Sequence, residues 1–137
     1  MPDCIFCQIV DGKIPSAKIK ESDTVLAFLD INPVSKGHCL VIPKAHYATF
    51  ADIPADVLTD MGKTLQQIGT AVEKVLGNEG YNVLLNNGRA AGQLIDHAHF
   101  HIVPRNTGDG VMEWPEVHPY SEGEMENIRQ ALAEAVS

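Results

Sequence analysis

The stretch Asp-His-Ala-His-Phe-His-Ile-Val-Pro-Arg, residues 96–105, alternates histidines with apolar residues and decides how this chain folds. Its histidines are His97, His99 and His101, and the apolar residues that alternate with them are Ala98, Phe100 and Ile102. Successive side chains of a β-strand point to opposite faces, so we expect a strand over residues 97–103. One face then carries the three imidazoles, and the other packs into the core. Neighbours on one face are about 6.5 to 7 Å apart, which lets the three rings share one small ligand.

Three interpretations of this histidine face are open. It can be a solvated strand face, although such faces usually carry Thr, Lys or Glu. It can bind zinc, because alternating histidines on a strand supply two ligands and a third can come from elsewhere. It can also hold a nucleophile, because an imidazole can attack phosphorus when a neighbour fixes its tautomer. The residues around the strand must decide between them.

A polar loop precedes the histidines, within residues 84–93, Leu-Leu-Asn-Asn-Gly-Arg-Ala-Ala-Gly-Gln. Gly88 and Gly92 allow a positive φ angle and a close approach of the backbone to a ligand. The loop is compatible with an ordinary hairpin connection. Beside three histidines it also suggests a phosphate-binding loop in which N–H groups face the anion.

Four further strands are predicted from short apolar runs bounded by Gly, Asn and Pro. With the histidine strand, the set covers residues 17–21, 24–29, 38–42, 81–86 and 97–103. We expect an α+β fold, with one antiparallel sheet of about five strands, one long helix packed on it and short terminal helices.

The long helix is predicted from apolar residues that recur every three or four positions. These are Val57, Leu58, Met61, Leu65, Ile68, Val72, Val75 and Leu76. Asp52 is expected to cap the start of this helix, and Gly77 to end it. Shorter helices are expected over residues 4–10 and 121–136, the second one amphipathic and exposed.

Length and composition suit one domain over residues 1–137, because 45% of the 137 residues are hydrophobic. We expect its core over about residues 4–105 and a C-terminal extension with a helix over 106–137. A formal net charge of −8 without a cluster of Lys and Arg argues against nucleic acid binding. Neither a membrane span nor a signal peptide is expected, so we place the protein in the cytosol, with the nucleus as an additional compartment.

Three cysteines in such a chain indicate thiols or a metal site rather than a disulfide framework. Cys39 lies in an apolar strand and is expected to pack in the core. Cys4 and Cys7 form a Cys-x-x-Cys pair, which is half a zinc site or a redox pair. No thioredoxin-like βαβ pattern follows the pair, which favours zinc.

The histidine stretch resembles that of the histidine triad (HIT) family of nucleotide hydrolases and transferases. The resemblance extends over most of residues 4–105, in family order. Besides the histidines, it includes Cys4-Ile5-Phe6-Cys7-Gln8-Ile9-Val10, Ile14-Pro15, Phe28-Leu29-Asp30-Ile31, His38-Cys39-Leu40-Val41-Ile42-Pro43-Lys44, Asn86 and Gly92-Gln93. It implies a HIT-like fold and a homodimer of two sheets side by side, which also protects the edge strand near residues 81–86 from aggregation.

By this resemblance, His99 is the nucleophile that takes the α-phosphoryl group and becomes a nucleotidyl-histidine. His101 binds the phosphate and helps the leaving group depart, and the backbone carbonyl of His97 accepts a hydrogen bond that fixes the tautomer of His99. The resemblance also assigns nucleotide contacts to Asp30 (ribose), to Asn86, Gly92 and Gln93 (phosphate and leaving group) and to Ile5, Phe6, Ile9, Phe28 and Ile31 (base). The apolar five can equally be plain core, and Asp30 can cap the turn at Asn32.

Some microbial HIT proteins bind zinc through a cysteine pair and two histidines. Cys4, Cys7, His46 and His97 match these positions, which implies a structural zinc site and no catalytic metal. Leu94 departs from the family, which often has Ser or Thr there to assist the leaving group, so phosphoramidate cleavage is in question.

We therefore predict a hydrolase that cleaves phosphoanhydride or phosphoramidate bonds at the α-phosphorus of purine nucleotide conjugates. One alternative is a zinc hydrolase with His97, His99 and His101 as ligands. The other is a purine-nucleotide-binding regulatory module whose turnover is incidental. The leaving group and the preferred base stay open.

Overall fold

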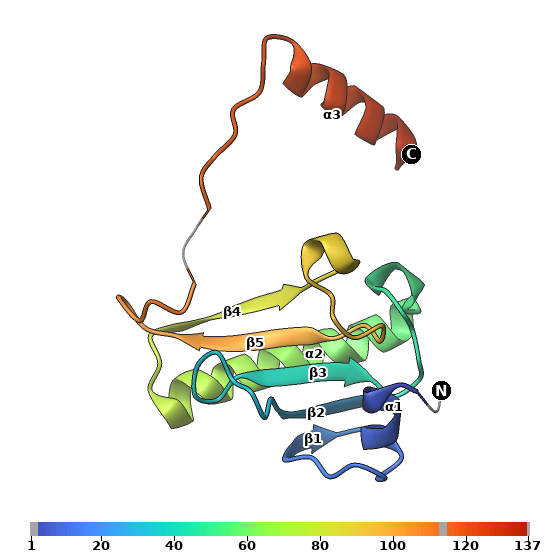
Figure 1. The fold of residues 1–137 in the computed structure, drawn as a ribbon, viewed down its shortest axis with the longest axis vertical. Coiled ribbons are helices and arrows are strands. Elements are labelled where there is room, and N and C mark those ends of the chain that lie inside the picture. The colour runs from blue at the N-terminus through green and yellow to red at the C-terminus, as the bar shows by residue number, and fades with distance from the viewer. Residues whose placement is uncertain (1–2, 113–114, 137) are drawn as a thin grey trace.

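The computed structural model describes residues 3–112 and 115–136 of the chain. Its sheet has five strands: β1 (Lys18–Glu21), β2 (Val25–Leu29), β3 (Cys39–Pro43), β4 (Gly80–Leu85) and β5 (Phe100–Arg105). The strands lie in the order β1-β2-β3-β5-β4, and each neighbouring pair is antiparallel. The long helix α2 (Ala55–Ala71) lies between β3 and β4 in the chain, and α1 (Ile5–Val10) and α3 (Glu124–Ala135) lie near its ends (Figure 1). The predicted α+β architecture is confirmed.

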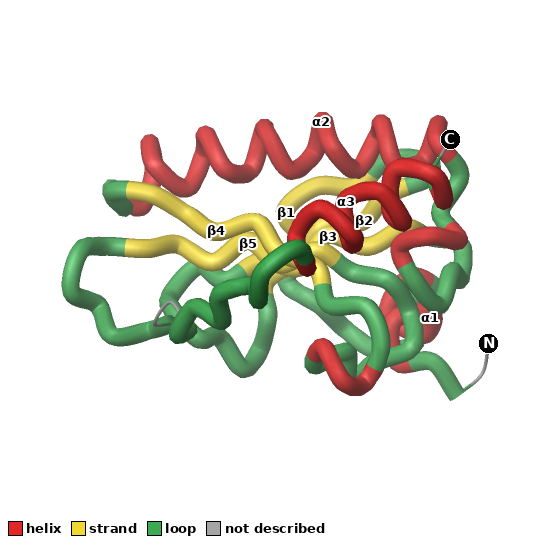
Figure 2. Tube along the Cα trace, turned by 90° about the horizontal axis from the view of Figure 1, so that it is seen from above, coloured by secondary structure: helices red, strands yellow, loops and turns green. Residues whose placement is uncertain are grey.

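The two faces of the sheet carry two separate apolar clusters. On one face α2 packs with Met61, Leu65 and Ile68 against residues of β2, β3 and β5. On the other face α1 packs with Phe6 and Ile9 against β2 and β3. Figure 2 shows α2 on one side of the sheet and α1 on the opposite side. Because α1 is short, it covers β2 and β3 on this face of the sheet and leaves the region over β5 open.

One row of directly opposed residues crosses the sheet and ends at this open part of the face. Phe28 on β2 is the direct partner of Leu40 on β3, and Leu40 is the partner of His101 on β5. Directly opposed residues in a sheet point to the same face. An apolar surface therefore runs from Phe28 across the sheet to the imidazole of His101, on the face opposite α2.

The predicted histidine strand begins three residues later than expected. Only His101 lies within β5, whereas residues 97–99 precede it. The pairing between β3 and β5 ends at Val41 and Phe100, because the chain then turns towards Tyr47, whose carbonyl accepts from the N–H of Ala98 at 2.7 Å. The expected strand over residues 97–103 is therefore wrong at its start. The three imidazoles nevertheless share one face, because the ring of Phe6 contacts those of His97 and His99, and the ring of His99 contacts that of His101. The rings of His99 and His101 lie 5.0 Å apart, closer than strand spacing gives.

The apolar side of the same stretch is confirmed. Ala98 and Ile102 are buried in the cluster that faces α2, and Phe100 packs against this cluster. The alternation of side chains thus continues before the strand begins, although the backbone there no longer pairs with β3.

The predicted ends of the long helix are half right. Gly77, with a φ of 71°, ends the helical segment after a π-turn over Val72–Leu76. Asp52 does not cap α2, because its side chain accepts from the N–H of Thr49 and caps a separate 3₁₀ turn. Val75 and Leu76 are exposed, so the apolar stripe that contacts the sheet ends at Val72.

The C-terminal helix α3 is exposed on all sides in the described chain. Its apolar residues Met125, Ile128 and Leu132 all face solvent, as the sequence predicts. Figure 1 shows α3 apart from the sheet, at the end of an extended segment. Within residues 3–112 and 115–136, none of the helices combines the length and apolarity that crossing a membrane requires.

Candidate active site

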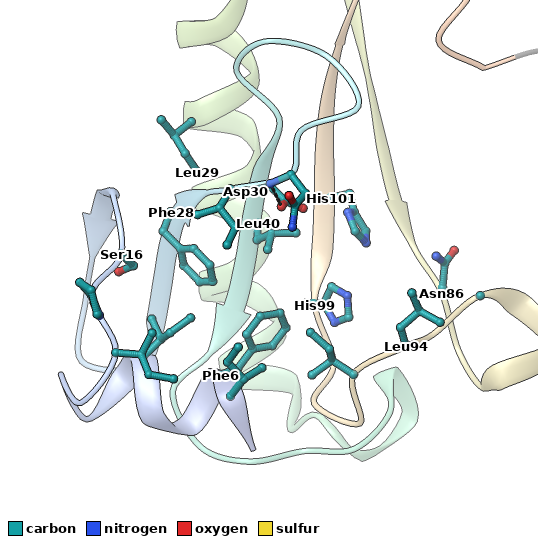
Figure 3. A pocket seen from close by; sticks show the side chains of 18 residues that line it. Phe6, Ser16, Phe28, Leu29, Asp30, Leu40, Asn86, Leu94, His99 and His101 are labelled. Atoms are coloured by element: carbon teal, nitrogen blue, oxygen red, sulfur yellow. Dashed lines mark hydrogen bonds between the residues drawn. The ribbon is translucent and has the colours of Figure 1, made fainter. Parts of the chain in front are cut away.

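A cavity of about 390 Å³ opens on the face opposite α2, between α1, the end of β2 and the loop before β5. This volume is within the range of small-molecule sites. The residues assigned to the nucleotide by the resemblance that line it are Ile5, Phe6, Ile9, Phe28, Asp30, Ile31, Asn86, Gly92, His99 and His101. Figure 3 shows Phe6 and Phe28 on one side of His99, and Asn86 and Leu94 on the other. His97 and Gln93 do not line the cavity.

The tautomer of His99 is fixed by one backbone group. Its Nδ1 lies 2.7 Å from the carbonyl oxygen of His97. A carbonyl can only accept, so Nδ1 carries the proton and Nε2 keeps its lone pair. Burial lowers the pKa of His99, which keeps the ring neutral near pH 7. The contact predicted between His97 and His99 is confirmed, and it leaves His99 with a free nucleophilic nitrogen.

His38, directly before β3, is a member of the site to which sequence reasoning gave no role. Its Nδ1 accepts from the N–H of Val34 at 3.2 Å, so in the neutral ring Nε2 carries the proton. That Nε2 lies 2.9 Å from Nδ1 of His101 and donates to it. The proton of His101 is therefore on Nε2. The usable signal was a histidine directly before a buried apolar strand.

Burial makes this pair neutral at physiological pH. It lowers the pKa of His101 to about 4, with smaller contributions from His99 and His38. It also lowers the pKa of His38, against the opposing effect of Asp30. His101 therefore stands beside His99 as a neutral ring whose Nε2–H can donate a hydrogen bond.

Asp30 takes part in a turn as well as in the cavity wall. Its Oδ1 accepts from the N–H of Asn32 at 2.8 Å, which confirms the turn-capping alternative. Its Oδ2 lies 3.8 Å from Nε2 of His38. A turn role does not remove Asp30 from the site, because the residue also lines the cavity.

Four N–H groups of the glycine loop are not free to form the phosphate cradle that its sequence suggested. Both Gly88 and Gly92 have positive φ angles, of 81° and 92°. However, the N–H groups of Gly88, Ala91, Gly92 and Gln93 all donate within the loop itself. Gly92 instead leaves room beside Asn86, whose amide nitrogen would lie 3.4 Å from an added Cβ.

Gln93 is part of the scaffold of this loop. Its Oε1 accepts from the N–H of Gly88 at 2.8 Å, and its Nε2 donates to the carbonyls of Ala48 and Ile95. A buried amide with these three bonds holds the loop against the preceding turn. The expected contact of Gln93 with phosphate does not fit this position, because the residue lies outside the cavity lining.

Four predicted metal ligands come together beside the cavity. Ligand atoms of Cys4, Cys7, His46 and His97 all lie within 4.8 Å of one another. Nδ1 of His97 is 3.4 Å from Sγ of Cys4 and 3.6 Å from Sγ of Cys7. Zinc bonds to sulfur and nitrogen in a tetrahedral site imply ligand separations of about 3.5 Å. Nε2 of His97 is 2.8 Å from the carbonyl of Pro43 and donates to it, which leaves Nδ1 with a lone pair for a metal.

The alternative with three triad histidines on one zinc ion does not fit this geometry. The ring of His97 belongs to the cysteine cluster, and Nδ1 of His99 donates to a carbonyl. Among the described residues, a second group of ligand types joins Asp30, His38 and His101. Nε2 of His38 uses its proton to bind His101 there, so it offers no lone pair to an ion.

The apolar side of the cavity is both core and wall. Phe6 and Phe28 are almost fully buried, and their rings contact edge to face at 5.8 Å. Phe6 also contacts the rings of His97 and His99, at 5.7 and 5.0 Å. Ile5 and Ile31 are exposed at the rim. These residues therefore belong to the core and also form the wall of the cavity, so both interpretations apply.

Sequence reasoning missed several residues of the lining and noted Leu94 only as a departure from the family. The missed residues are Ile14, Pro15, Ser16, Leu29, Asn32, Leu40 and Ile95.

This fold and site define a class, and the chain belongs to the HIT domain family, whose model matches residues 11–108. It is 46% identical to adenosine 5'-monophosphoramidase of Schizosaccharomyces pombe over 137 residues, which cover 98% of this chain and 96% of that protein. A HIT family protein from Bacillus anthracis superposes with a TM-score of 0.90 at 35% identity, over 98% of both chains. A Zn-bound histidine triad family protein from Mycobacterium smegmatis gives a TM-score of 0.77 at 37% identity, over 98% of this chain and 96% of that one. The family resemblance and the HIT-like fold are confirmed.

Proposed function

We propose that this protein hydrolyses purine nucleotide conjugates at the α-phosphorus, cleaving a phosphoramidate or phosphoanhydride bond through a nucleotidyl-His99 intermediate. The observation that carries the proposal is the hydrogen bond from Nδ1 of His99 to the carbonyl of His97, because it leaves the lone pair on Nε2 of a ring that lines the cavity. The phosphoramidase activity in the name of the Schizosaccharomyces pombe relative supports the same chemistry.

The reaction has two displacements at phosphorus. In the first, Nε2 of His99 forms a bond to phosphorus while the bond to the leaving group breaks. The leaving atom accepts a hydrogen bond from Nε2–H of His101, which His38 holds in the donating tautomer, and takes its proton from water as the bond breaks. In the second, water replaces His99 on phosphorus and gives up a proton to the solvent, which releases the nucleoside monophosphate and neutral His99. The negative charge of bound phosphate stabilises the cationic ring of nucleotidyl-His99.

The nucleoside is proposed to lie along the apolar side of the cavity. Phe6, Ile9 and Phe28 form a slot for the flat face of a purine, with Ile5 and Ile31 at its rim. Asp30 stands between the slot and His101, in reach of ribose hydroxyls. Asn86 contacts the phosphate or the leaving group at the opposite end (Figure 3).

Zinc, when bound to Cys4, Cys7, His46 and His97, supplies a structural link between the start of the chain and the active site. The donor set fits this metal, and the solved Mycobacterium smegmatis relative is Zn-bound. We further propose a cytosolic homodimer, since β4 forms an edge of the sheet and α3 leaves an apolar face open.

Rapid quenching with a nucleotide substrate tests the intermediate. We expect an adduct on His99 that is labile in acid and stable in base, as for phosphorus bound to an imidazole nitrogen. His99→Ala is expected to lose about 10⁴-fold in turnover while it keeps most of its affinity for nucleoside monophosphate. An adduct on another residue, or near wild-type turnover of His99→Ala, contradicts the mechanism. A wild-type rate barely above that in water, with tight nucleotide binding, indicates the regulatory module instead.

A further inference from the structure

Leu94 is an exposed leucine at the catalytic end of the cavity. Its side chain is 76% exposed, although it lines the cavity together with Asn86, His99 and His101. Figure 3 places it next to Asn86, on the side of His99 away from Phe28. The proposed nucleoside site is on the Phe28 side. Leu94 therefore lies where the leaving group departs.

The backbone that presents Leu94 is held on both sides. Gln93, the residue before Leu94, is anchored by its three side-chain hydrogen bonds, one of which reaches the carbonyl of Ile95. The carbonyl of Leu94 itself accepts from Nη1 of Arg89 at 3.3 Å. The exposure of the side chain is thus built into a fixed loop, and a ligand that covers it pays little for ordering the backbone.

A second cavity of about 340 Å³ begins on the other side of Leu94. It shares Ile5, Leu94 and Ile95 with the first cavity. The remaining residues of its wall are Asp3, Cys4, His46, Arg89 and Asp96. The three shared residues form an apolar saddle between the two cavities, and Ile5 on this saddle is 45% exposed. In the proposed arrangement, a group that left the α-phosphorus past Leu94 would meet this second cavity beyond the saddle.

We propose that Leu94 is a specificity-determining residue, which selects conjugates whose leaving group is an amine with an aromatic or branched apolar side chain. The inference rests on the proposed function and names its leaving-group class. The phosphorus–nitrogen bond breaks as Nε2 of His99 bonds to phosphorus, and the amine leaves with a proton from water while Nε2–H of His101 donates a hydrogen bond to its nitrogen. Leu94 contacts only the carbon skeleton of that amine.

The physical basis is apolar burial. A side chain that covers Leu94 removes exposed apolar surface from water, whereas a small or polar amine leaves Leu94 solvated. Leu94 offers no hydroxyl to the leaving atom, so contact is its available contribution. We expect a preference of about tenfold in kcat/KM, which corresponds to about 1.4 kcal/mol.

Two substrates of matched chemistry test this inference. These are the adenosine 5'-phosphoramidates of 2-phenylethylamine and 2-methoxyethylamine, two primary amines of similar chain length. For the wild type we expect kcat/KM about tenfold higher with the phenylethyl conjugate. In Leu94→Ala and Leu94→Ser we expect this ratio to fall below about threefold through loss on the phenylethyl side. Leu94→Met should keep it, as should Leu76→Ser, which changes an exposed leucine outside both cavities.

The outcomes separate the inference from the function on which it rests. Leu94→Ser adds a hydroxyl, which can speed the reaction of both substrates. Leu94→Ala removes the apolar contact without adding a hydroxyl, so it measures the effect of the contact alone. An unchanged ratio in both variants overturns the role of Leu94 and leaves the proposed function standing. If the wild type cleaves neither conjugate, phosphoramidate hydrolysis itself is refuted, and the inference with it.

Discussion

Single backbone groups set the protonation of the histidines in this site. The carbonyl of His97 accepts from His99, and the carbonyl of Pro43 accepts from His97. The N–H of Val34 donates to His38, and this fixes the tautomers of His38 and His101 together. In the proposed function, one residue type thus supplies a nucleophile, a donor and a metal ligand, because the rings meet different hydrogen-bond partners.

Removal of the ring that orients His101 is expected to slow the chemistry. In His38→Ala the donor to Nδ1 of His101 is lost, and we expect kcat to fall about 100-fold. His38→Gln should stay within about fivefold of the wild type, because its amide oxygen can accept from Val34 and its NH₂ can donate to His101. Steady-state kinetics and melting temperatures of both variants measure this. Equal loss of kcat in the two variants, or none in His38→Ala, contradicts the positioning role.

Acid is expected to destabilise the fold through the buried histidines. The pKa of His101 is lowered to about 4 by burial, against about 6.5 in an unfolded chain. Between these values the unfolded state binds more protons, so the free energy of unfolding falls as the pH falls from 6.5 to 4, by roughly 2 to 3 kcal/mol for His101. Above pH 7 this contribution is constant.

Denaturant titrations from pH 4 to 8 on the wild type and His101→Gln measure the contribution. The variant lacks the titrating ring, so the difference between the two curves isolates it from other acid effects such as loss of metal. We expect that difference to change only below about pH 6.5. A difference that stays constant over the whole range shows that folding does not lower the pKa of His101.

At the scale of elements, α1 belongs to two sites at once. Cys4 precedes this helix and Cys7 lies within it, while Ile5, Phe6 and Ile9 on the same six-residue element line the proposed nucleotide cavity. A helix this short is not stable alone. Its position therefore depends on the cluster of Phe6 and Ile9 with the sheet and, in the proposed zinc site, on metal bonds from Cys4 and Cys7.

Metal removal is expected to loosen this helix. The protein purified without chelator should hold about one zinc ion per chain, and Cys7→Ala should lose it, with a fall of the melting temperature on the order of 10 °C. Because α1 carries part of the proposed base slot, affinity for nucleoside monophosphate should also fall, by about tenfold. Metal analysis and calorimetry measure both. Cys39→Ala, which removes a cysteine outside the cluster, should keep the ion. A metal-free protein of full stability refutes the site.

The sequence predicted the elements better than their ends. The alternation of residues 97–102 predicted correctly which side chains face the core, but not that pairing with β3 stops at Phe100. That limit depends on the hydrogen bond from the N–H of Ala98 to the carbonyl of Tyr47, and a partner so far away in the chain is not readable from local pattern. Asp52 failed for a different reason. It has the residue type of a helix cap, but its carboxylate caps the 3₁₀ turn that begins after Thr49, so two neighbouring turns compete for one local cap.

The candidate site was likewise predictable in part. The cysteine–histidine set and most of the cavity residues were predictable, since the family resemblance carries them by position. The role of His38 was not, because it depends on a contact with His101 across 63 residues. The glycine loop was predictable only in part, because a pattern of glycines predicts the positive φ angles of Gly88 and Gly92, whereas the direction of each N–H follows from its partners.

At the scale of the whole molecule, charge and apolar surface act in opposite directions. A formal net charge of −8 makes two copies repel one another at low ionic strength. Against this, β4 is an edge strand and α3 presents Met125, Ile128 and Leu132 to solvent. Burial of such side chains contributes about 1.5 to 3 kcal/mol each. A second copy that covers α3 is therefore held by apolar contact and not by charge.

This balance predicts a homodimer that salt strengthens. Light scattering at micromolar concentration should give twice the chain mass of 14.9 kDa, with tighter association as salt screens the repulsion. The double variant Ile128→Glu/Leu132→Glu places charge on the apolar face of α3 and should weaken dimerisation at least 100-fold. Gln130→Glu adds charge to the same helix at a position outside that apolar set and should leave the dimer intact. A monomeric wild type contradicts the dimer, and a double variant that dimerises as tightly as the wild type shows that α3 has no part in it.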